Sequence, residues 1–566
     1  MNGTPSLLRP AALATALALA AALPSPALAK PPRLTLVVTV DSLGTDQLLR
    51  MRARFKAGGL GSLMAQGAFF PNARVEYAST RTGPGHATLV TGANPWRHGI
   101  VGNAFLNRAT GKLEATFADA EHPVLEAPPG AHDVSPANLL AESLADRVRL
   151  FTQERGKAVS VSAKSRAAIA MGGRLGQAWW FNEAVGKWVT GTWYTKEFPG
   201  WVKAFNEKGI ADAYFGKEWG LLEKKETYLG EDDRPFEGAL WAMGRTFPHP
   251  LGGGLPRPGK ESYAALNWSG MMSEVVAQFA RAAIEGEGLG KDDVPDLLLV
   301  SFSASDYVNH VYGPYSWEAQ DALLRVDRAM ADLVAAAERA AGGRANLLVV
   351  VTADHAIAAV PEEWAGRGVA SVRVSPVTVT QALGKELSAK FGGEIVVQGE
   401  PPDAFLSGKG YGTGKADAAA VRRAAAAWLS KHPSVAVAVA RDDLESAGDL
   451  RGYGRSLRVG FHPDRSGDVL YVPRPFHVWD VETFGTDHGT PYLYDCQIPL
   501  VVAGHGVKAG YHAQEISLVD VAPTVATIME MGLPAQAEGK VRAEIVPAPA
   551  NSIPKPAATP GTAPAQ

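Results

Sequence analysis

Five short apolar runs constrain the fold of this chain more than any other feature of its sequence. They cover residues 34–40, 158–161, 297–302, 347–352 and 500–503. The runs are rich in Val and Leu, and their apolar character is continuous rather than alternating. Runs of this kind are typical of strands that are covered on both faces, as in a parallel sheet between two layers of helices.

Helical patterns lie between these runs. Residues 316–341 place apolar side chains on one stripe and end at Gly342, as expected of an amphipathic helix. Ser135 followed by Pro136 predicts the start of another helix, and residues 518–531 predict a last one. Because strands alternate with helices, the sequence predicts an α/β fold with a doubly wound, mostly parallel sheet.

Two segments depart from this alternation. Residues 165–295 contain eight of the thirteen tryptophans amid Gly, Pro and charged residues. We expect an inserted cap subdomain there, in which the aromatic rings mainly pack an irregular chain; binding of the organic part of a substrate is the alternative role. A second insert is expected at about residues 365–480, with a helix over 418–430 that Asp417 caps. Both inserts belong to one predicted catalytic domain over residues 30–546.

Both ends of the chain are expected to lie outside this domain. Residues 1–29 carry Arg9, an Ala- and Leu-rich core and an Ala-Leu-Ala end, which is the order of a secretory signal peptide cleaved before Lys30. A retained membrane anchor is the alternative, although the core is short for a bilayer span. Residues 547–566 are rich in Pro and Ala and are expected to be disordered. The sequence thus predicts a periplasmic or secreted protein.

The overall composition excludes several classes of partner. The formal net charge is −3 at pH 7, which gives no reason to expect nucleic acid, or a membrane surface after signal cleavage, as a partner. Cys496 is the single cysteine and sits before an apolar run, so it is expected to be a buried apolar residue. We expect small-molecule partners and a monomer rather than an oligomer.

Acidic residues follow the first, third and fourth apolar runs. They are Asp41, Asp306 and Asp354, the last with His355 beside it. In open parallel sheets, ligands bind at the carboxyl ends of the strands. A single Asp at a strand end is usually a turn former, whereas three of them predict side chains that converge on one rim.

Two further histidines complete a set of metal ligands. His310 lies four residues after Asp306, which on a helical turn places both side chains on one face. His488 lies in a turn bounded by glycine. Three carboxylates and three imidazoles are the ligands expected of a two-metal hydrolytic centre.

Thr82 precedes Gly-Pro-Gly and an apolar stretch, which predicts the N-cap of a helix. A helix start offers free amides and a positive dipole end, both suited to a phosphate oxygen. Capping alone would explain this threonine. Beside a divalent ion, however, its hydroxyl would become a nucleophile near neutral pH.

Together these motifs resemble the alkaline phosphatase superfamily over about residues 34–532. The motifs are Asp41, Thr82-Gly-Pro-Gly-His86, Asp306-x-x-x-His310, Asp354-His355 and Asp487-His488-Gly. Within that superfamily, Asn103 in Val-Gly-Asn and the triplet Lys164-Ser-Arg166 are similar to the phosphate-irrepressible, PafA-type periplasmic enzymes.

The resemblance implies a broad phosphate monoester hydrolase with two zinc ions. It implies that one zinc is bound by Asp41, Thr82, Asp354 and His355, and the other by Asp306, His310 and His488. It further implies that Thr82 attacks phosphorus to form a phosphothreonine, which is then hydrolysed, while Asn103, Lys164 and Arg166 hold the non-bridging oxygens.

Lys164 and Arg166 also favour monoesters on physical grounds. Two residues apart beyond a strand, they are expected to point the same way. A terminal phosphate is a dianion, and an ammonium with a guanidinium matches its charge. A diester has one negative charge fewer and a second organic arm. A solvated basic strand end remains the alternative interpretation of this pair.

Other functions stay open at this stage. A phosphodiesterase or nucleotide pyrophosphatase of the same superfamily would share Thr82, Asn103 and the metal ligands. A sulfatase fits less well, because it needs Cys or Ser where Thr82 stands. A non-catalytic binding protein would use the same Asp and His residues only to stabilise its fold through metal. Mixed Asp and His ligands favour zinc but also suit manganese, iron or cobalt.

Overall fold

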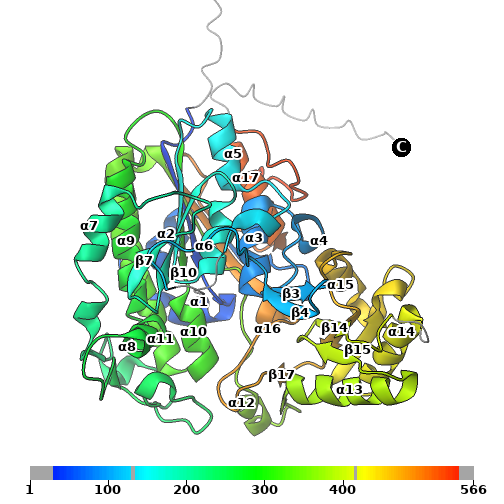
Figure 1. The fold of residues 1–566 in the computed structure, drawn as a ribbon. Helices are drawn as coiled ribbons and strands as arrows, with labels where there is room; N and C mark the ends of the chain where they lie inside the picture. Colours follow the sequence, from blue (N-terminus) through cyan, green and yellow to red (C-terminus); the bar gives the residue numbers. More distant parts are fainter. Residues whose placement is uncertain (1–29, 129–133, 413–416, 547–566) are drawn as a thin grey trace, which may run out of the picture.

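The computed structural model describes residues 30–128, 134–412 and 417–546. The predicted signal peptide and the predicted disordered tail lie outside these residues. A ten-stranded sheet forms the centre of the molecule (Figure 1). Its middle strand β1 (Leu34–Val40) pairs in parallel with β10 (Asp296–Phe302) on one side and with β11 (Leu347–Thr352) on the other.

The sheet is mixed but mostly parallel at its centre. Beyond β10 it continues through β5 (Ala158–Ser162) and β6 (Gln177–Asn182), both parallel, to β7 (Lys187–Val189). Beyond β11 lies β18 (Gln497–Gly504), which runs antiparallel to both β11 and the next strand, β2 (Ala68–Arg74). All residues of β1, β10 and β11 are buried, as their continuous apolar sequences predict.

Helices cover both faces of this sheet (Figure 1). On one face, α9 (Met272–Glu287) and α11 (Trp317–Ala341) pack on each other and on the central strands. On the other lie α3 (Thr82–Thr91), α5 (Leu144–Phe151), α6 (Ser165–Gly172) and α17 (Val521–Ile528). The predicted doubly wound α/β fold is confirmed. None of the described helices is long and apolar enough to cross a bilayer.

Two helix predictions were wrong in detail. Ser135 caps only a short 3-10 turn over Pro136–Asn138, and α5 begins nine residues later at Leu144. The reason is a stronger start signal at Ser143: its side chain accepts from the Asp146 amide, while the Asp146 carboxylate accepts from the Ser143 amide. Helix α3 begins at Thr82 itself, so Arg81 rather than Thr82 is its N-cap.

The two predicted inserts are built differently. The segment 165–295 supplies β6 and β7 to the central sheet, and four of its tryptophans are buried in the core, where Trp188 stacks on Phe279 with ring centres 4.1 Å apart. The segment 365–480 instead forms its own antiparallel sheet of β13 (Val396–Gln398), β14 (Asp403–Ser407), β16 (Val469–Pro473) and β15 (Val435–Ala440). Helices α13 (Pro376–Phe391) and α14 (Ala418–Leu429) pack on this sheet around a separate hydrophobic core (Figure 1).

Candidate metal centre and active site

The carboxyl ends of the three central strands bring the predicted ligands together. Asp41 follows β1, and Asp354 with His355 follows β11. Asp306 lies in the first turn of α10 (Ala304–Tyr312), which starts just after β10. Because β1 pairs in register with both neighbours, these strand ends meet at one rim. The candidate ligands there form two groups, and within each group the ligand atoms lie within 4.8 Å of one another.

The first group consists of Asp41, Asp354 and His355, which are all fully buried. His355 Nε2 lies 3.5 Å from Asp41 Oδ1 and 3.3 Å from Asp354 Oδ2. We call this group the buried triad. Its residues come from the ends of two adjacent strands, so the core of the sheet fixes their positions.

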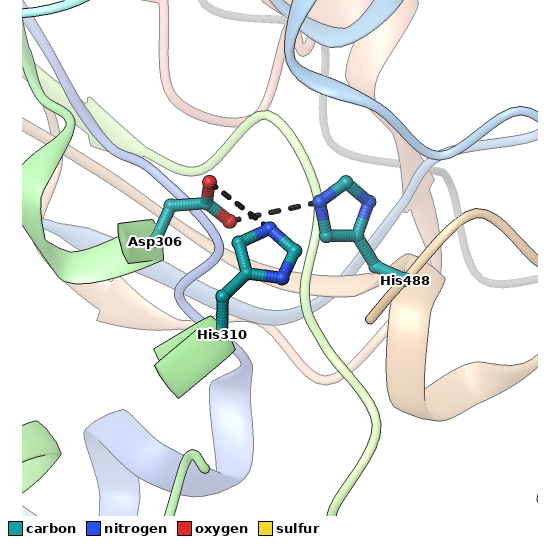
Figure 2. Close-up of side chains that lie close together, drawn as sticks. All are labelled: Asp306, His310 and His488. Carbon is teal, nitrogen blue, oxygen red and sulfur yellow. Dashed lines mark ion pairs between the residues drawn. The ribbon is translucent and has the colours of Figure 1, made fainter. Parts of the chain in front are cut away.

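The second group consists of Asp306, His310 and His488, and we call it the open triad (Figure 2). Asp306 and His310 come from one turn of α10, while His488 reaches across from a distant loop. Nε2 of His310 lies 3.4 Å from Asp306 Oδ2, and Nε2 of His488 lies 3.6 Å from Asp306 Oδ1. The His310 side chain is 27% exposed, whereas those of Asp306 and His488 are 3% exposed, so this triad meets solvent through His310.

All three histidines are held in the same way through Nδ1. The Nδ1 atoms of His310, His355 and His488 bond the backbone carbonyls of Thr486, Ala356 and Thr80, at 2.9, 3.0 and 2.7 Å. A carbonyl oxygen can only accept, so Nδ1 carries the proton in each ring. In a neutral ring, Nε2 is then left with a free lone pair directed at the carboxylates, which is the form of imidazole that binds a metal ion.

These donor sets fit divalent metal ions. Two ligand atoms about 2.0–2.1 Å from one tetrahedral ion lie about 3.3–3.4 Å apart, and the Nε2 to carboxylate distances in both triads are 3.3–3.6 Å. Buried polar atoms without a hydrogen-bond partner include Asp41 Oδ1, Asp306 Oδ1, Asp354 Oδ2 and His355 Nε2. Such atoms are costly to bury unless a ligand satisfies them. The site therefore suits a binuclear centre.

Burial also sets the charge states in the triads. It lowers the pKa of His355 and, more strongly, that of His488, which keeps both rings neutral as ligands must be. At His310 the effect of burial is outweighed by the Asp306 carboxylate, and its pKa rises to about 9. For Asp41, burial and the adjacent Asp354 carboxylate raise the pKa well above its ordinary value.

Two glycines permit close approaches that assemble the site. A Cβ on Gly85 would lie 2.5 Å from the Asp354 carbonyl oxygen, so this glycine lets α3 pack directly on the buried triad. Gly485 has φ +57°, and a Cβ there would lie 1.7 Å from the His310 carbonyl oxygen. The loop that carries His488 can therefore approach α10 only with glycine at this position.

Thr82 lies at the start of α3 and lines a cleft of about 430 Å³ together with the open triad. Asn103 lines the same cleft, and its Oδ1 accepts from the Gly83 amide at 2.9 Å. That bond occupies one of the helix-start amides expected to face phosphate. It also leaves the Asn103 side-chain amide group as a donor toward the cleft.

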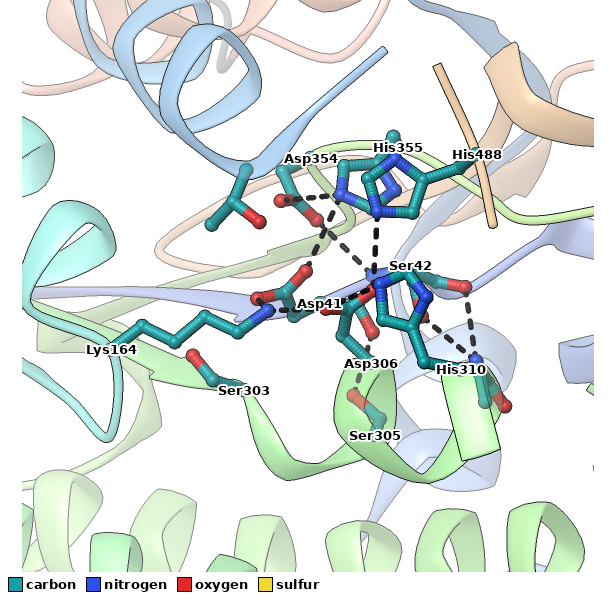
Figure 3. A network of polar contacts seen from close by, with 12 residues as sticks. Asp41, Ser42, Lys164, Ser303, Ser305, Asp306, His310, Asp354, His355 and His488 are labelled. Atoms are coloured by element: carbon teal, nitrogen blue, oxygen red, sulfur yellow. Dashed lines mark hydrogen bonds and ion pairs between the residues drawn. The ribbon is translucent and has the colours of Figure 1, made fainter. Parts of the chain in front are cut away.

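Lys164 connects the two triads (Figure 3). Its side chain is buried, and its Nζ donates to Asp41 Oδ2 at 2.8 Å and also to Asp306 Oδ2. Burial lowers the pKa of Lys164, but the two carboxylates outweigh it and raise that pKa above its ordinary value. The ammonium therefore stays charged and neutralises part of the carboxylate cluster.

Arg166 is placed differently from Lys164. It lies in the first turn of α6 and lines the cleft, whereas Lys164 is the N-cap of that helix. Lys164 is buried, whereas Arg166 is partly exposed, and the charges of both act on Tyr307. That both side chains point the same way stays a prediction.

Sequence reasoning left several contributors to the site unassigned. His86 Nδ1 bonds the Thr82 carbonyl at 2.9 Å and lies 3.2 Å from Asp354 Oδ2, so it ties α3 to the buried triad. Asp487 accepts from the His488 amide and lies 4.0 Å from Arg81. His98 is buried on Thr88 and is structural. The motif positions of His86 and Asp487 were visible in the sequence, but their contacts depend on distant chain segments.

The cleft also has an apolar wall, which the sequence suggested only as an alternative role for the tryptophans of residues 165–295. Trp268 and Tyr307 lie there with their rings stacked, and Leu240 and Phe484 line the same space. Tyr307 stands within the Asp306-x-x-x-His310 motif, which is the one sequence signal that could have placed it.

Comparisons with known proteins agree with this geometry. The family described as type I phosphodiesterase / nucleotide pyrophosphatase matches residues 35–478. Alkaline phosphatase PafA of Elizabethkingia meningoseptica is 30% identical over 526 residues, which cover 91% of this chain and 94% of that protein. Alkaline phosphatase PhoV of Synechococcus elongatus is 29% identical over 529 residues, or 91% of this chain and 93% of that protein.

A solved structure extends the similarity to three dimensions. The crystal structure of wild-type alkaline phosphatase PafA superposes with a TM-score of 0.85 at 28% sequence identity. The match covers 91% of this chain and 99% of that chain. The central sheet, its helices and the segment 365–480 therefore belong to one shared architecture.

Proposed function

This chain belongs to the type I phosphodiesterase / nucleotide pyrophosphatase family, as a PafA-like member of the alkaline phosphatase superfamily, and we propose that it hydrolyses a broad range of phosphate monoesters. It is an alkaline phosphatase-like hydrolase. The observation that carries the proposal is the pair of metal-binding triads at one rim, beside a cleft that Thr82 and Arg166 line.

In this proposal the chain holds two zinc ions. Asp41, Asp354 and His355, with the Thr82 hydroxyl, would bind one of them, and Asp306, His310 and His488 would bind the other. When bound, such ions supply positive charge that lowers the pKa of a nearby hydroxyl and stabilises the entering and leaving oxygens.

Thr82 is the proposed nucleophile. Its Oγ bonds to phosphorus as the bond from phosphorus to the leaving alcohol breaks, which gives a phosphothreonine. Water then attacks phosphorus, the bond to Thr82 Oγ breaks, and inorganic phosphate leaves. His86 supports this step because it fixes the Thr82 carbonyl and contacts Asp354.

Asn103, Lys164 and Arg166 are proposed to hold the non-bridging oxygens. Arg166 and the Asn103 amide already line the cleft, and a guanidinium matches the charge and fork geometry of a phosphate. Lys164 would contribute once the charges of Asp41 and Asp306 are otherwise neutralised. Two cations suit the dianion of a monoester better than the monoanion of a diester.

The cellular setting follows from the sequence. We propose that residues 1–29 act as a cleavable export signal and that the mature protein works in the periplasm or outside the cell. Zinc is the proposed metal because mixed His and carboxylate ligands favour it, although manganese, iron and cobalt accept the same donors.

A diesterase is the second candidate, because the matched family is described by that activity. Rates on p-nitrophenyl phosphate and bis-p-nitrophenyl phosphate separate the two functions. We expect the monoester to be preferred, and a strong preference for the diester would overturn the proposal. Thr82→Ala should abolish turnover and keep two equivalents of bound metal. A metal-loaded wild type that hydrolyses neither ester would instead indicate a binding protein.

A further inference from the structure

The cleft extends beyond the groups that are needed to bind a phosphate. Its volume of about 430 Å³ is shared between the polar residues of the site and an apolar wall. The wall consists of Leu240, Trp268, Tyr307, Val311 and Phe484. Leu240, Trp268, Tyr307 and Phe484 are each only partly buried, so they present apolar surface to the space next to the open triad.

The rings of this wall are held in a fixed arrangement. Trp268, at the end of α8 (Lys260–Asn267), stacks on Tyr307 of α10, with ring centres 4.4 Å apart and planes 18° from parallel. The Nζ of Lys164 lies 4.7 Å from the Tyr307 ring centre, and Trp241 meets Trp268 edge-on at 6.3 Å. Since both rings are packed on other groups, the wall is preformed and loses little entropy when it binds a ligand.

Two carboxylates, those of Asp480 and Glu482, line the same cleft as this wall. Asp480 is partly buried and Glu482 is exposed, and the Glu482 amide bonds Asp480 Oδ1 at 3.1 Å. Across residues 30–128, 134–412 and 417–546, neither carboxylate forms an ion pair with a Lys, Arg or His side chain. Asp487 differs, since Arg81 and His310 lie 4.0 and 3.8 Å from it.

The two arginines of the cleft are assigned to other partners. Arg81 pairs with Glu400 at 3.1 Å, and Arg166 stands beside the phosphate position of the proposed function. An alcohol group that extends from the phosphate therefore meets apolar rings and unpaired negative charge.

We propose that this wall and the two carboxylates form a leaving-group subsite for phosphate monoesters of aromatic alcohols that carry no negative charge. The ring packs against Trp268 and Phe484, while Asp480 and Glu482 favour a cationic substituent and repel an anionic one. This inference rests on the proposed monoesterase function and names the preferred class of alcohol.

Truncation of the wall tests the apolar part. The change in kcat/KM between wild type and variant is compared for phenyl phosphate and methyl phosphate, so that intrinsic leaving-group reactivity cancels. Trp268→Ala and Phe484→Ala should each lower kcat/KM for phenyl phosphate about 3- to 10-fold and alter that for methyl phosphate less than twofold. Trp268→Phe, which keeps a ring, should restore most of the phenyl phosphate activity.

Inhibitors test the same subsite without turnover. Phenylphosphonate should inhibit wild type more strongly than methylphosphonate, and Trp268→Ala should reduce that difference. If Trp268→Ala lowered kcat/KM equally for both esters and weakened inhibition equally for both phosphonates, Trp268 would only position Tyr307 and Lys164. That result would overturn the subsite.

The charged part is tested with 3-(aminomethyl)phenyl phosphate and 3-carboxyphenyl phosphate. Wild type should prefer the cationic ester, and Asp480→Asn and Glu482→Gln should each bring the two kcat/KM values closer. Glu386→Gln, an exposed carboxylate on α13, is the matched control and should leave the ratio unchanged. A wild type that hydrolyses all these esters without ring or charge preference would overturn the subsite alone, whereas no turnover of any monoester would overturn the proposed function too.

Discussion

The buried and open triads use the same side-chain chemistry in contrasting surroundings. Asp41, Asp354 and His355 are fully buried at the ends of β1 and β11, which lie in the middle of the sheet. The open triad takes two ligands from one helical turn and the third from a loop, and His310 remains partly exposed. The buried triad is therefore enclosed in the core, while the open triad lines the cleft.

This difference in burial affects how easily a bound ion could leave each triad. An ion in the buried triad would be enclosed by sheet residues, so its release requires an opening of the fold. The open triad depends on the approach of the 480–488 loop to α10. A hydrogen bond of 3.0 Å from the Thr486 amide to the His310 carbonyl oxygen maintains this approach. Lys164 is the residue that joins the two environments (Figure 3).

The largest expected effect comes from removing one ligand of each triad. Asp354→Asn and His310→Asn should each lower kcat/KM by more than about 100-fold, because loss of a residue that only supports a ligand already costs 10- to 100-fold. Each variant should retain about one metal equivalent by elemental analysis. During chelator treatment, the remaining metal should leave His310→Asn more slowly than Asp354→Asn. Equal release rates would show that the two triads do not differ in access.

The next effect concerns the cation between the triads. Lys164→Met should destabilise the metal-free protein by about 3–5 kcal/mol, since it leaves buried carboxylates without their partner. Arg166→Met should change stability by no more than about 0.5 kcal/mol, because its side chain faces the cleft. Urea unfolding in the presence of chelator measures both. Similar midpoints for the two variants would contradict the bridging role of Lys164.

Glycine substitutions test how each triad is assembled. Gly85→Ala and Gly485→Ala should each destabilise the fold by about 1–3 kcal/mol through forced contacts. Only Gly485→Ala should specifically weaken metal binding at the open triad, since its new methyl group would push the His488 loop away from α10. Thermal unfolding and metal titration distinguish these outcomes, and Gly200→Ala, where a Cβ meets open space, is the control.

Acid should produce the smallest effect, through the buried His98. Burial lowers the pKa of His98, which bonds Thr88 on α3, to about 3. Its pKa in the unfolded chain is about 6.5, so the unfolded state takes up the proton first and stability falls as pH drops from about 6.5 toward 3. At pH 5.5 this group should cost about 1.4 kcal/mol. His98→Gln should reduce the loss of stability between pH 7 and 5.5 by about 1.2 kcal/mol; an unchanged slope would mean that His98 is not the group responsible.

Much of the fold could be predicted because its elements carry strong local signals. The run 347–352 is β11 to the residue, and the stripe ending at Gly342 is α11. The antiparallel direction of β18 could not be predicted, since a continuous apolar run has the same pattern in either direction. The start of α5 was misplaced because two Ser signals lie eight residues apart, and only the second has an acidic residue at the third helical position.

The candidate site shows the same division. The two groups of ligands proposed from the motifs match the two triads. In contrast, the contact of His86 with Asp354 and the aromatic wall of Trp268 and Phe484 join residues hundreds of positions apart. Neither has a local sequence pattern, and Lys164 gave no sign that its ammonium would lie between two carboxylates.

The sequence alone determined the strands, the helices and the types of ligand, because periodicity and capping act over a few residues. The tertiary structure decided how closely the ligands within each group approach one another, which of two neighbouring cations is buried, and which apolar side chains line the cleft. Those outcomes depend on distances between segments that only the packed sheet and its loops bring within a few ångströms.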